Sequence, residues 1–194
     1  MMQTGIDRRL LLGVAFCALG LSACARRFPP VELGGAPVSK DATILTALKS
    51  SALHSRFAAA IESDDELNEL FDGLGPLTVF APTDQAFAEF SSKADSERFD
   101  SDAEYLSTVL RGHIVPARVF SEEMESALPG LAGETRLIAL NDETLFVTRE
   151  EDALRITDRQ KRFATLGTLD AEAVNGIIHS VYNILLPGRP GIDD

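Results

Sequence analysis

Cysteine and tryptophan are the scarcest residues of this chain. Its 194 residues include no tryptophan and two cysteines, Cys17 and Cys24. The chain beyond Cys24 therefore has no disulfide and no thiol nucleophile, and its core must depend on apolar packing. The sequence also lacks a Gly-x-Ser-x-Gly motif, a His-Glu-x-x-His motif and a phosphate-binding glycine loop. We therefore predict no enzymatic activity and no cofactor.

Basic residues are outnumbered by acidic ones. Lysine and arginine total 18 against 30 aspartates and glutamates, which gives a formal net charge of −12. A surface of this sign repels phosphate backbones, so we predict no nucleic-acid partner. Acidic clusters at residues 63–66, 122–125 and 150–152 lack the alternating oxygen ligands and the glycine turn of a calcium loop. We therefore predict no metal site.

The apolar segment near the start of the chain is short. It covers residues 10–20, whereas about 20 apolar residues are needed to cross a bilayer. The segment follows Arg8 and Arg9 and precedes the run from Leu21 to Cys24, an order typical of an export signal. We predict a signal peptide over residues 1–23, and the arginine pair leaves open whether export uses the twin-arginine route.

The run Leu21-Ser22-Ala23-Cys24 resembles the bacterial lipobox, in which the cysteine is acylated and becomes the first mature residue. The resemblance implies that Cys24 anchors the protein in the bacterial cell envelope, at the outer membrane or at a membrane surface facing the periplasm. Two or more acyl chains hold a protein stably on a bilayer. The alternative is a soluble periplasmic protein with a chance cysteine at this position.

Residues 24–40 contain three prolines and two adjacent glycines but few large apolar side chains. Prolines and glycines interrupt regular structure, and without apolar side chains the segment has little to bury. We therefore predict a flexible linker behind the lipidated Cys24.

Helix-start signals dominate the next part of the chain. They are an N-cap at Asp41, capping boxes over residues 63–66 and 101–104, and an N-cap at Thr83. Apolar residues recur at helical spacing after each of them. His54 falls on one of these helices, where we expect a solvated side chain.

Strand signals dominate the later part. Strands are predicted at residues 77–80, 154–157, 164–169 and 177–186, with a hairpin formed by 137–140 and 144–148. Helices early in the chain and strands later predict an α+β domain.

Three segments resemble the signatures of the fasciclin domain. They are Leu77 to Phe87, which contains Ala-Pro-Thr-Asp, Leu110 to Pro116, and Asn175 to Pro187, which begins Asn-Gly-Ile-Ile-His. The resemblance implies a fasciclin domain over residues 41–188, with a short tail at 189–194. The implied fold is a wedge-shaped β-sandwich with several helices packed at one side.

The first signature has a structural interpretation residue by residue. Pro82 has no N–H group with which to continue a strand ladder, so it ends the strand. Thr83 can accept backbone donors at the start of a helix, where Asp84 meets the positive end of the helix dipole. Phe87 is expected to point inward from this helix.

The other two signatures contain the histidines. Asn175 and Gly176 predict a turn that tolerates positive φ, and Pro116 closes the middle signature. No nucleophile motif accompanies His113 or His179. We predict that both are buried or half-buried hydrogen-bonding posts that join strand to helix, and a ligand or metal role is the alternative.

The family resemblance also carries the functional expectation. Fasciclin domains are mostly extracellular or envelope modules for cell adhesion and protein–protein contact. We therefore predict a lipid-anchored, non-catalytic adhesion or protein–protein interaction module, whose partners are the membrane and a protein or envelope matrix. A carrier of a hydrophobic ligand such as a carotenoid is the alternative, and an enzyme acting through His113 or His179 is a third.

One segment departs from the family pattern. Residues 155–163 lack the Asn-Gly turn often found before the penultimate strand, and they include Arg159, Lys161 and Arg162. This basic island in an acidic chain is either a docking site for an acidic partner or a charged hairpin tip.

Overall fold

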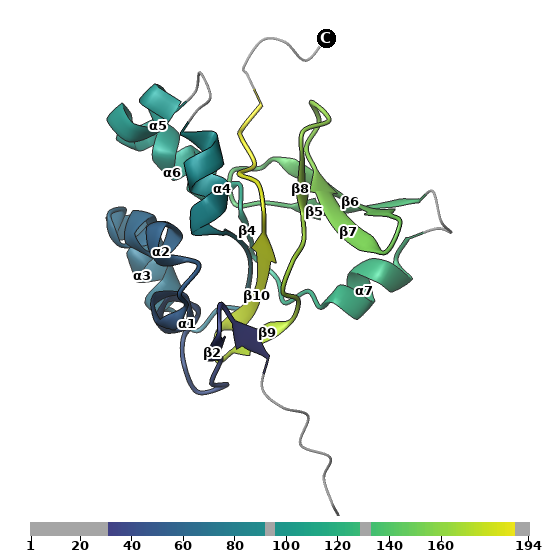
Figure 1. Cartoon of the computed structure of the whole chain (residues 1–194), viewed down its shortest axis with the longest axis horizontal. Helices are drawn as coiled ribbons and strands as arrows, with labels where there is room; N and C mark the ends of the chain where they lie inside the picture. The colour runs from purple at the N-terminus through teal and green to yellow at the C-terminus, as the bar shows by residue number, and fades with distance from the viewer. Residues whose placement is uncertain (1–30, 92–95, 129–132, 189–194) are drawn as a thin grey trace, which may run out of the picture.

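The computed structural model describes residues 31–91, 96–128 and 133–188 (Figure 1). The predicted signal peptide, Cys24 and the predicted tail at 189–194 lie outside these residues. The described helices are α1 (Ile44–Ser50), α2 (Ser55–Glu62), α3 (Asp65–Asp72), α4 (Asp84–Phe90), α5 (Ser96–Ser101), α6 (Ala103–Arg111) and α7 (Ser121–Ser126). The described strands are β1 (Glu32–Leu33), β2 (Ala36–Pro37), β3 (Leu77–Pro82), β4 (Ile114–Val115), β5 (Glu134–Ile138), β6 (Thr144–Glu150), β7 (Ala153–Thr157), β8 (Phe163–Thr165), β9 (Ala171–Ala173) and β10 (Gly176–Val181). None of the described helices has the length and hydropathy that a membrane span requires.

Two four-stranded sheets form the centre of the molecule. The first has the order β4-β3-β10-β9, with β3 and β10 parallel, and the second has the antiparallel order β5-β6-β7-β8. Helices α1 to α6 lie on one side of the first sheet and the second sheet lies on its other side (Figure 1). The predicted α+β fold, with its helices at one side, is confirmed.

The central strands of the first sheet are buried because both of their faces are covered. Every residue of β3 and β10 is buried. Val79 belongs to the core formed with the helices, whereas its neighbour Phe80 belongs to the core between the two sheets. A strand covered on both faces has a continuous apolar run, which is why the sequence predicted β3 correctly.

Strand pairing brings the three signature segments together. The parallel ladder pairs Leu77 with Gly176 and Pro82 with Val181, so the first and third signatures are neighbours. Val79 pairs with Ile114 of β4, which adds the middle signature to the same sheet. The predicted hairpin is also confirmed, with Ile138 of β5 paired with Thr144 of β6.

The flexible linker predicted over residues 24–40 is wrong from Val31 onward. Strands β1 and β2 form a hairpin in which Leu33 is fully buried, and Val38, which follows β2, is buried as well. Gly34 and Gly35 have φ angles of 59° and 81° and make the turn of this hairpin. The glycines therefore mark a tight turn rather than a tether.

Three predicted helix starts are displaced by one or two residues. The N-caps are Thr43, Asp64 and Asp102, in place of Asp41, Ser63 and Ser101. Asp64 and Asp102 each accept a hydrogen bond from a backbone N–H in the first turn. A carboxylate gains more than a serine hydroxyl at this position because it also interacts with the helix dipole. The sequence also missed α5, α7 and β9, which are short.

Candidate functional site

His54 is buried, so the prediction of a solvated side chain is wrong. It lies just before α2, with Nδ1 2.7 Å from the Ser51 hydroxyl and Nε2 3.0 Å from the Ser180 hydroxyl of β10. Burial lowers the pKa of His54 to about 4, although the nearby Asp84 carboxylate opposes the shift. The neutral imidazole thus connects the segment between α1 and α2 to the central strand of the first sheet.

His113 lies between the end of α6 and β4 and is also buried. Its Nδ1 donates to the Val109 carbonyl at 2.9 Å, and its Nε2 accepts from the Leu185 N–H at 3.0 Å. Burial lowers the pKa of His113 to about 4. Because one ring nitrogen donates and the other accepts, the neutral tautomer satisfies both backbone groups.

His179 lies on the face of β10 opposite to Ser180, the partner of His54. Its ring stacks on Phe80 with 5.6 Å between centroids. Its Nε2 donates to the Val119 carbonyl at 3.0 Å, and its Nδ1 accepts from the Asp170 N–H at 3.2 Å. Burial lowers the pKa of His179, and the Val119 bond and the Asp170 carboxylate oppose that shift. The Asp170 carboxylate itself accepts from the N–H of Ser121 at 2.8 Å and from its hydroxyl.

The three imidazoles have the same chemical situation. Both nitrogens of each ring have a hydrogen-bond partner, and all three side chains are buried. A general base needs a ring nitrogen that reaches substrate, and these nitrogens are already engaged with the protein interior. In the described part of the chain, no group of three or more His, Cys, Asp and Glu side chains is placed to hold a metal ion.

The Pro82-Thr83-Asp84 segment joins two helices. Pro82 is the last residue of β3, and Thr83 caps α4 by accepting from the Ala86 N–H at 3.2 Å. The Asp84 carboxylate reaches α2 instead, where it accepts from the Ser55 hydroxyl at 2.8 Å and from the Arg56 N–H at 2.8 Å.

Asp84 therefore caps a helix that begins almost thirty residues earlier. The N-cap residue of α2 is His54, whose side chain makes no capping bond. No local signal in the sequence indicates this long-range cap. Farther along α4, the buried Phe87 meets Phe99 of α5 edge to face, with 5.8 Å between centroids.

Asn175 connects elements from three parts of the chain. Its side-chain oxygen accepts from the Ile44 N–H at 2.8 Å and so caps α1. Its amide nitrogen donates to the carbonyls of Phe71, at 2.7 Å, and Gly73, at 3.3 Å, at the end of α3. Its backbone carbonyl accepts from the Leu77 N–H at 3.0 Å. Asn175 is buried, which makes these bonds costly to lose.

The predicted turn is present, with Val174 and Asn175 joining β9 to β10, but it does not use the positive φ that Asn175 and Gly176 tolerate. Neither residue is among the described positions with positive φ, and Gly176 is the first residue of β10. Glycine is needed here for space, because a Cβ atom at this position would overlap the Leu77 carbonyl oxygen and crowd Ile44.

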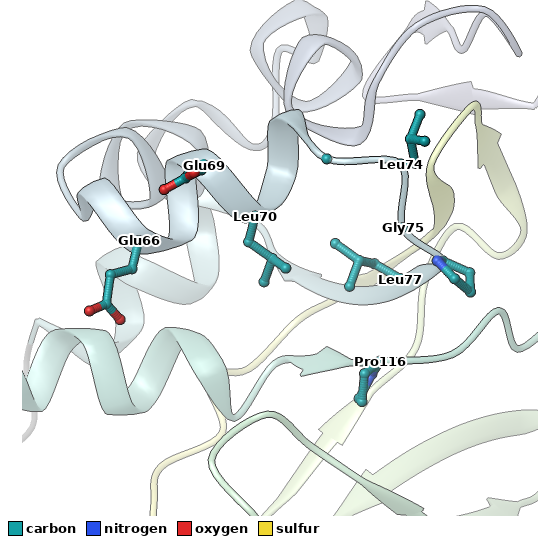
Figure 2. Close-up of a pocket in the computed structure, with 9 residues that line it drawn as sticks. Glu66, Glu69, Leu70, Leu74, Gly75, Leu77 and Pro116 are labelled. Atoms are coloured by element: carbon teal, nitrogen blue, oxygen red, sulfur yellow. The ribbon is translucent and has the colours of Figure 1, made fainter.

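An open groove lies between the end of α3 and Pro116, and its cavity volume is about 610 Å³ (Figure 2). Pro116 is exposed at this groove, and Leu74 is 95% exposed, the largest fraction among the exposed large apolar residues of the described chain. Glu66 at one end of the groove is paired with Arg111 at 2.6 Å. The lining residues are Glu66, Glu69, Leu70, Gly73, Leu74, Gly75, Pro76, Leu77 and Pro116.

The basic island is the turn between β7 and β8. Arg162 forms an ion pair with Asp158 at 2.5 Å and donates to the Leu186 carbonyl at 2.7 Å. Arg159 donates to the Thr144 hydroxyl at 3.3 Å, and the Lys161 ammonium lies 5.9 Å from the centre of the Phe146 ring. These bonds are internal, which favours the hairpin-tip interpretation over a docking site.

Comparison with known proteins gives consistent matches. The family model described as "Fasciclin domain" matches residues 52–187. The chain is 28% identical over 177 residues to protein sll1483 of Synechocystis sp., which covers 88% of this chain and 90% of that protein. It is also 28% identical over 153 residues to stabilin-1 of Homo sapiens, covering 79% of this chain but 6% of stabilin-1.

A solved structure of a FAS1 domain pair, from the insect cell adhesion molecule fasciclin I, superimposes with a TM-score of 0.64 at 17% identity. The match covers 75% of this chain and 51% of that one. At this identity the match shows the fold alone. The chain thus spans most of the Synechocystis relative, but only a small part of stabilin-1 and about half of the FAS1 pair.

Proposed function

Because the chain belongs to the fasciclin domain family, we propose that it is a non-catalytic interaction module anchored by lipid in the bacterial cell envelope. Cys24 carries the acyl chains after residues 1–23 are removed. The domain contacts another envelope protein or a matrix component and so contributes to adhesion.

The state of the histidines carries the non-catalytic part of the proposal. His54, His113 and His179 are buried, with both ring nitrogens of each engaged inside the domain. The described groove is lined by apolar and backbone groups apart from Glu66 and Glu69, and Glu66 is already paired with Arg111. Two carboxylates on one helix, without a nucleophile between them, supply no acyl- or phosphoryl-transfer chemistry.

The envelope location has two supports. The order of charged residues, short apolar segment and Leu-Ser-Ala-Cys is that of a lipoprotein signal. The FAS1 domain pair of similar fold comes from an insect cell adhesion molecule, and we propose a cell-envelope location for this chain by analogy. The acidic domain would stay in the aqueous phase while the acyl chains on Cys24 insert in the bilayer.

The anchor is tested by purifying the protein from membranes of its source cells and measuring the mass of the N-terminal peptide. We expect a peptide that begins at Cys24 and carries acyl mass, and a Cys24→Ser variant that leaves the membrane fraction. An unmodified N-terminus would overturn the anchor.

Adhesion is tested in cells that lack the gene, complemented with the wild type or with Cys24→Ser. We expect surface attachment and cell aggregation to fall in the deletion strain and to recover only with the anchored form. Unchanged attachment in the deletion strain, together with no envelope partner cross-linked to the domain, would overturn the interaction role.

A carrier of a hydrophobic ligand is the second candidate, because the groove lined by Leu70, Leu77 and Pro116 has a volume within the range of small-molecule sites. Protein purified from its native host would then absorb visible light or release lipid on extraction. A Leu70→Glu variant would lose that ligand, and a colourless, lipid-free wild type would exclude this candidate.

A further inference from the structure

Residues from Val31 onward are packed in the domain, so only a short segment joins the domain to its proposed anchor at Cys24. The length of that segment limits how far the domain can lie from the anchor. The described structure begins at Val31, whose carbonyl accepts from the Val38 N–H at 3.0 Å, and the buried Leu33 holds this hairpin against the core. Seven residue steps separate Cys24 from Val31, and even a fully extended chain of that length reaches only ~25 Å. With Cys24 anchored as proposed, the end of the domain that carries Val31 would stay within ~25 Å of the bilayer, a distance smaller than the diameter of a domain of this size.

That end of the domain is built from four chain segments. In Figure 1, β1, β2 and β9 lie together at the end from which the described chain starts, while α5 lies far from them. The Val174 N–H, in the turn between β9 and β10, donates to the Ala42 carbonyl at 2.9 Å. The loop before β3 packs against the same turn, because a Cβ atom on Gly75 would overlap the Asn175 carbonyl.

Exposed apolar side chains gather on these segments. Leu74 is 95% exposed and Val174 is 54% exposed, and Val31 is also exposed. In Figure 2 the Leu74 side chain lies at the rim of the groove and points away from Pro116, which lines its other side. Contact with water is unfavourable for an exposed leucine at a loop tip. Burial of that side chain in an apolar phase lowers the free energy.

The charges of this end offset one another only in part, and Asp72, two residues before Leu74, adds an exposed carboxylate. Lys40, whose side chain is 77% exposed, and Arg118 both pair with Glu172. Glu32 and Asp41 are exposed on neighbouring segments. The two basic side chains lower the repulsion between this end and an anionic bilayer without removing it, and they do not form a strongly basic patch.

We infer that this tethered end, defined by Val31, Leu74 and Val174, is a membrane-contact face that rests on the bilayer holding Cys24. The inference rests on the proposed lipid anchor. A few apolar side chains bind a bilayer too weakly to hold a free protein, but a short tether makes the contact intramolecular, at an effective concentration of about millimolar. The domain therefore has a fixed orientation, with α5 and its neighbours directed away from the membrane.

The mature chain has no cysteine other than Cys24, so single reporter thiols are easily placed. The lipidated full-length protein is reconstituted in phosphatidylcholine vesicles, with a fluorophore on Leu74→Cys, Val174→Cys or, as the control on α5, Asp100→Cys. Quenching by spin-labelled lipids is measured for each. We expect several-fold stronger quenching at positions 74 and 174 than at 100, with no need for anionic lipid.

A second set of variants separates orientation from anchoring. With the reporter at 174, Leu74→Glu should reduce lipid quenching several-fold, whereas Phe163→Glu, a matched exposed apolar position on β8, should not. Protein that does not float with the vesicles overturns the anchor. Protein that floats with the vesicles but gives equal quenching at positions 74 and 100 overturns the membrane-contact face alone. A reporter at position 74 that is shielded from water but not quenched by the spin-labelled lipids also overturns it, because a protein rather than the bilayer then covers Leu74.

Discussion

The helical side of the domain and the outer face of its second sheet are stabilised in different ways. On the helical side, His54, His113 and Asn175 are buried and bridge backbone segments far apart in the chain. On the second sheet, Arg136 lies 5.4 Å from the centre of the Phe146 ring, where the side chains are partly exposed. Water replaces a lost hydrogen-bond partner on an exposed face but not in a core. A polar contact on the helical side therefore contributes much more to the free energy of unfolding than one on the outer face of the second sheet.

Acid gives the largest expected difference between the two regions. The pKa values of His54 and His113 are lowered to about 4 in the folded domain, whereas an unfolded histidine titrates near 6.5. Protons therefore bind the unfolded chain first, and the stability contributed by the neutral imidazoles is present above pH 6.5 and is lost as the pH falls toward 4. From pH 7 to pH 5 we expect a loss of ~2 kcal/mol for each of these two histidines.

Urea unfolding at pH 7 and pH 5 measures this loss, because most carboxylates stay ionised over that range. A His113→Gln variant keeps a polar side chain but does not titrate, so its pH dependence should be weaker than that of the wild type. Equal unfolding free energies for the wild type at the two pH values would show that the imidazoles are not the cause of acid sensitivity.

Asn175→Ala is the strongest expected single substitution. It leaves the Ile44 N–H and the Phe71 and Gly73 carbonyls without their partner, which should cost ~3 kcal/mol in the free energy of unfolding. The matched control is Asn141→Ala in the turn between β5 and β6, where the side chain is only partly buried, donates to the Thr108 carbonyl of α6 at 3.2 Å and accepts from the Glu143 N–H at 3.2 Å. Chemical unfolding of both variants should show a much smaller loss for the control, and equal losses would contradict the comparison.

Gly176→Ala should destabilise by steric overlap. The added Cβ meets the Leu77 carbonyl, and separating two central strands costs ~2–3 kcal/mol. Gly35→Ala is the control, since Gly35 has φ 81° but no atom within 4 Å of an added Cβ. Its cost should be ~1 kcal/mol, from backbone conformation alone. Thermal unfolding distinguishes the two, and a milder effect at Gly176 than at Gly35 would refute the spatial explanation.

Arg136→Ala on the second sheet has the smallest expected effect. It removes the contact with the partly exposed Phe146 and an ion pair with the exposed Glu134. We expect a loss below ~1 kcal/mol in urea unfolding. A loss as large as that of Asn175→Ala would show that the outer face of the sheet is as tightly coupled as the helical core.

Local signals in the sequence predicted much of the fold. The continuous apolar run predicted β3, the hairpin over β5 and β6 followed from alternation around a polar turn, and Thr83 preceded α4 as a cap. The displaced caps at Asp64 and Asp102 show the limit of such signals. Where Ser and Asp are adjacent, the sequence alone does not show which of the two is the N-cap residue.

Local sequence signals do not predict the structural roles of His54, Asp84 and Asn175. Each has its partner in a distant part of the chain, as with Ser180 for His54 and Ile44 for Asn175. The N-terminal hairpin was missed for a related reason, because Leu33 packs in a core cluster whose other described members all follow it in the chain. Periodicity reports a helix or strand but not the surface that covers it.

The amino-acid sequence by itself determined the class of fold, the three signature segments and the absence of thiol chemistry beyond Cys24, because each depends on residue type and spacing along the chain. Only the tertiary structure decided that the histidines are neutral and internal, that Asn175 joins three elements, and that the hairpin of β1 and β2 is packed on the core. Those properties depend on desolvation and on contacts between distant segments, which exist only after the two sheets and the helices have packed together.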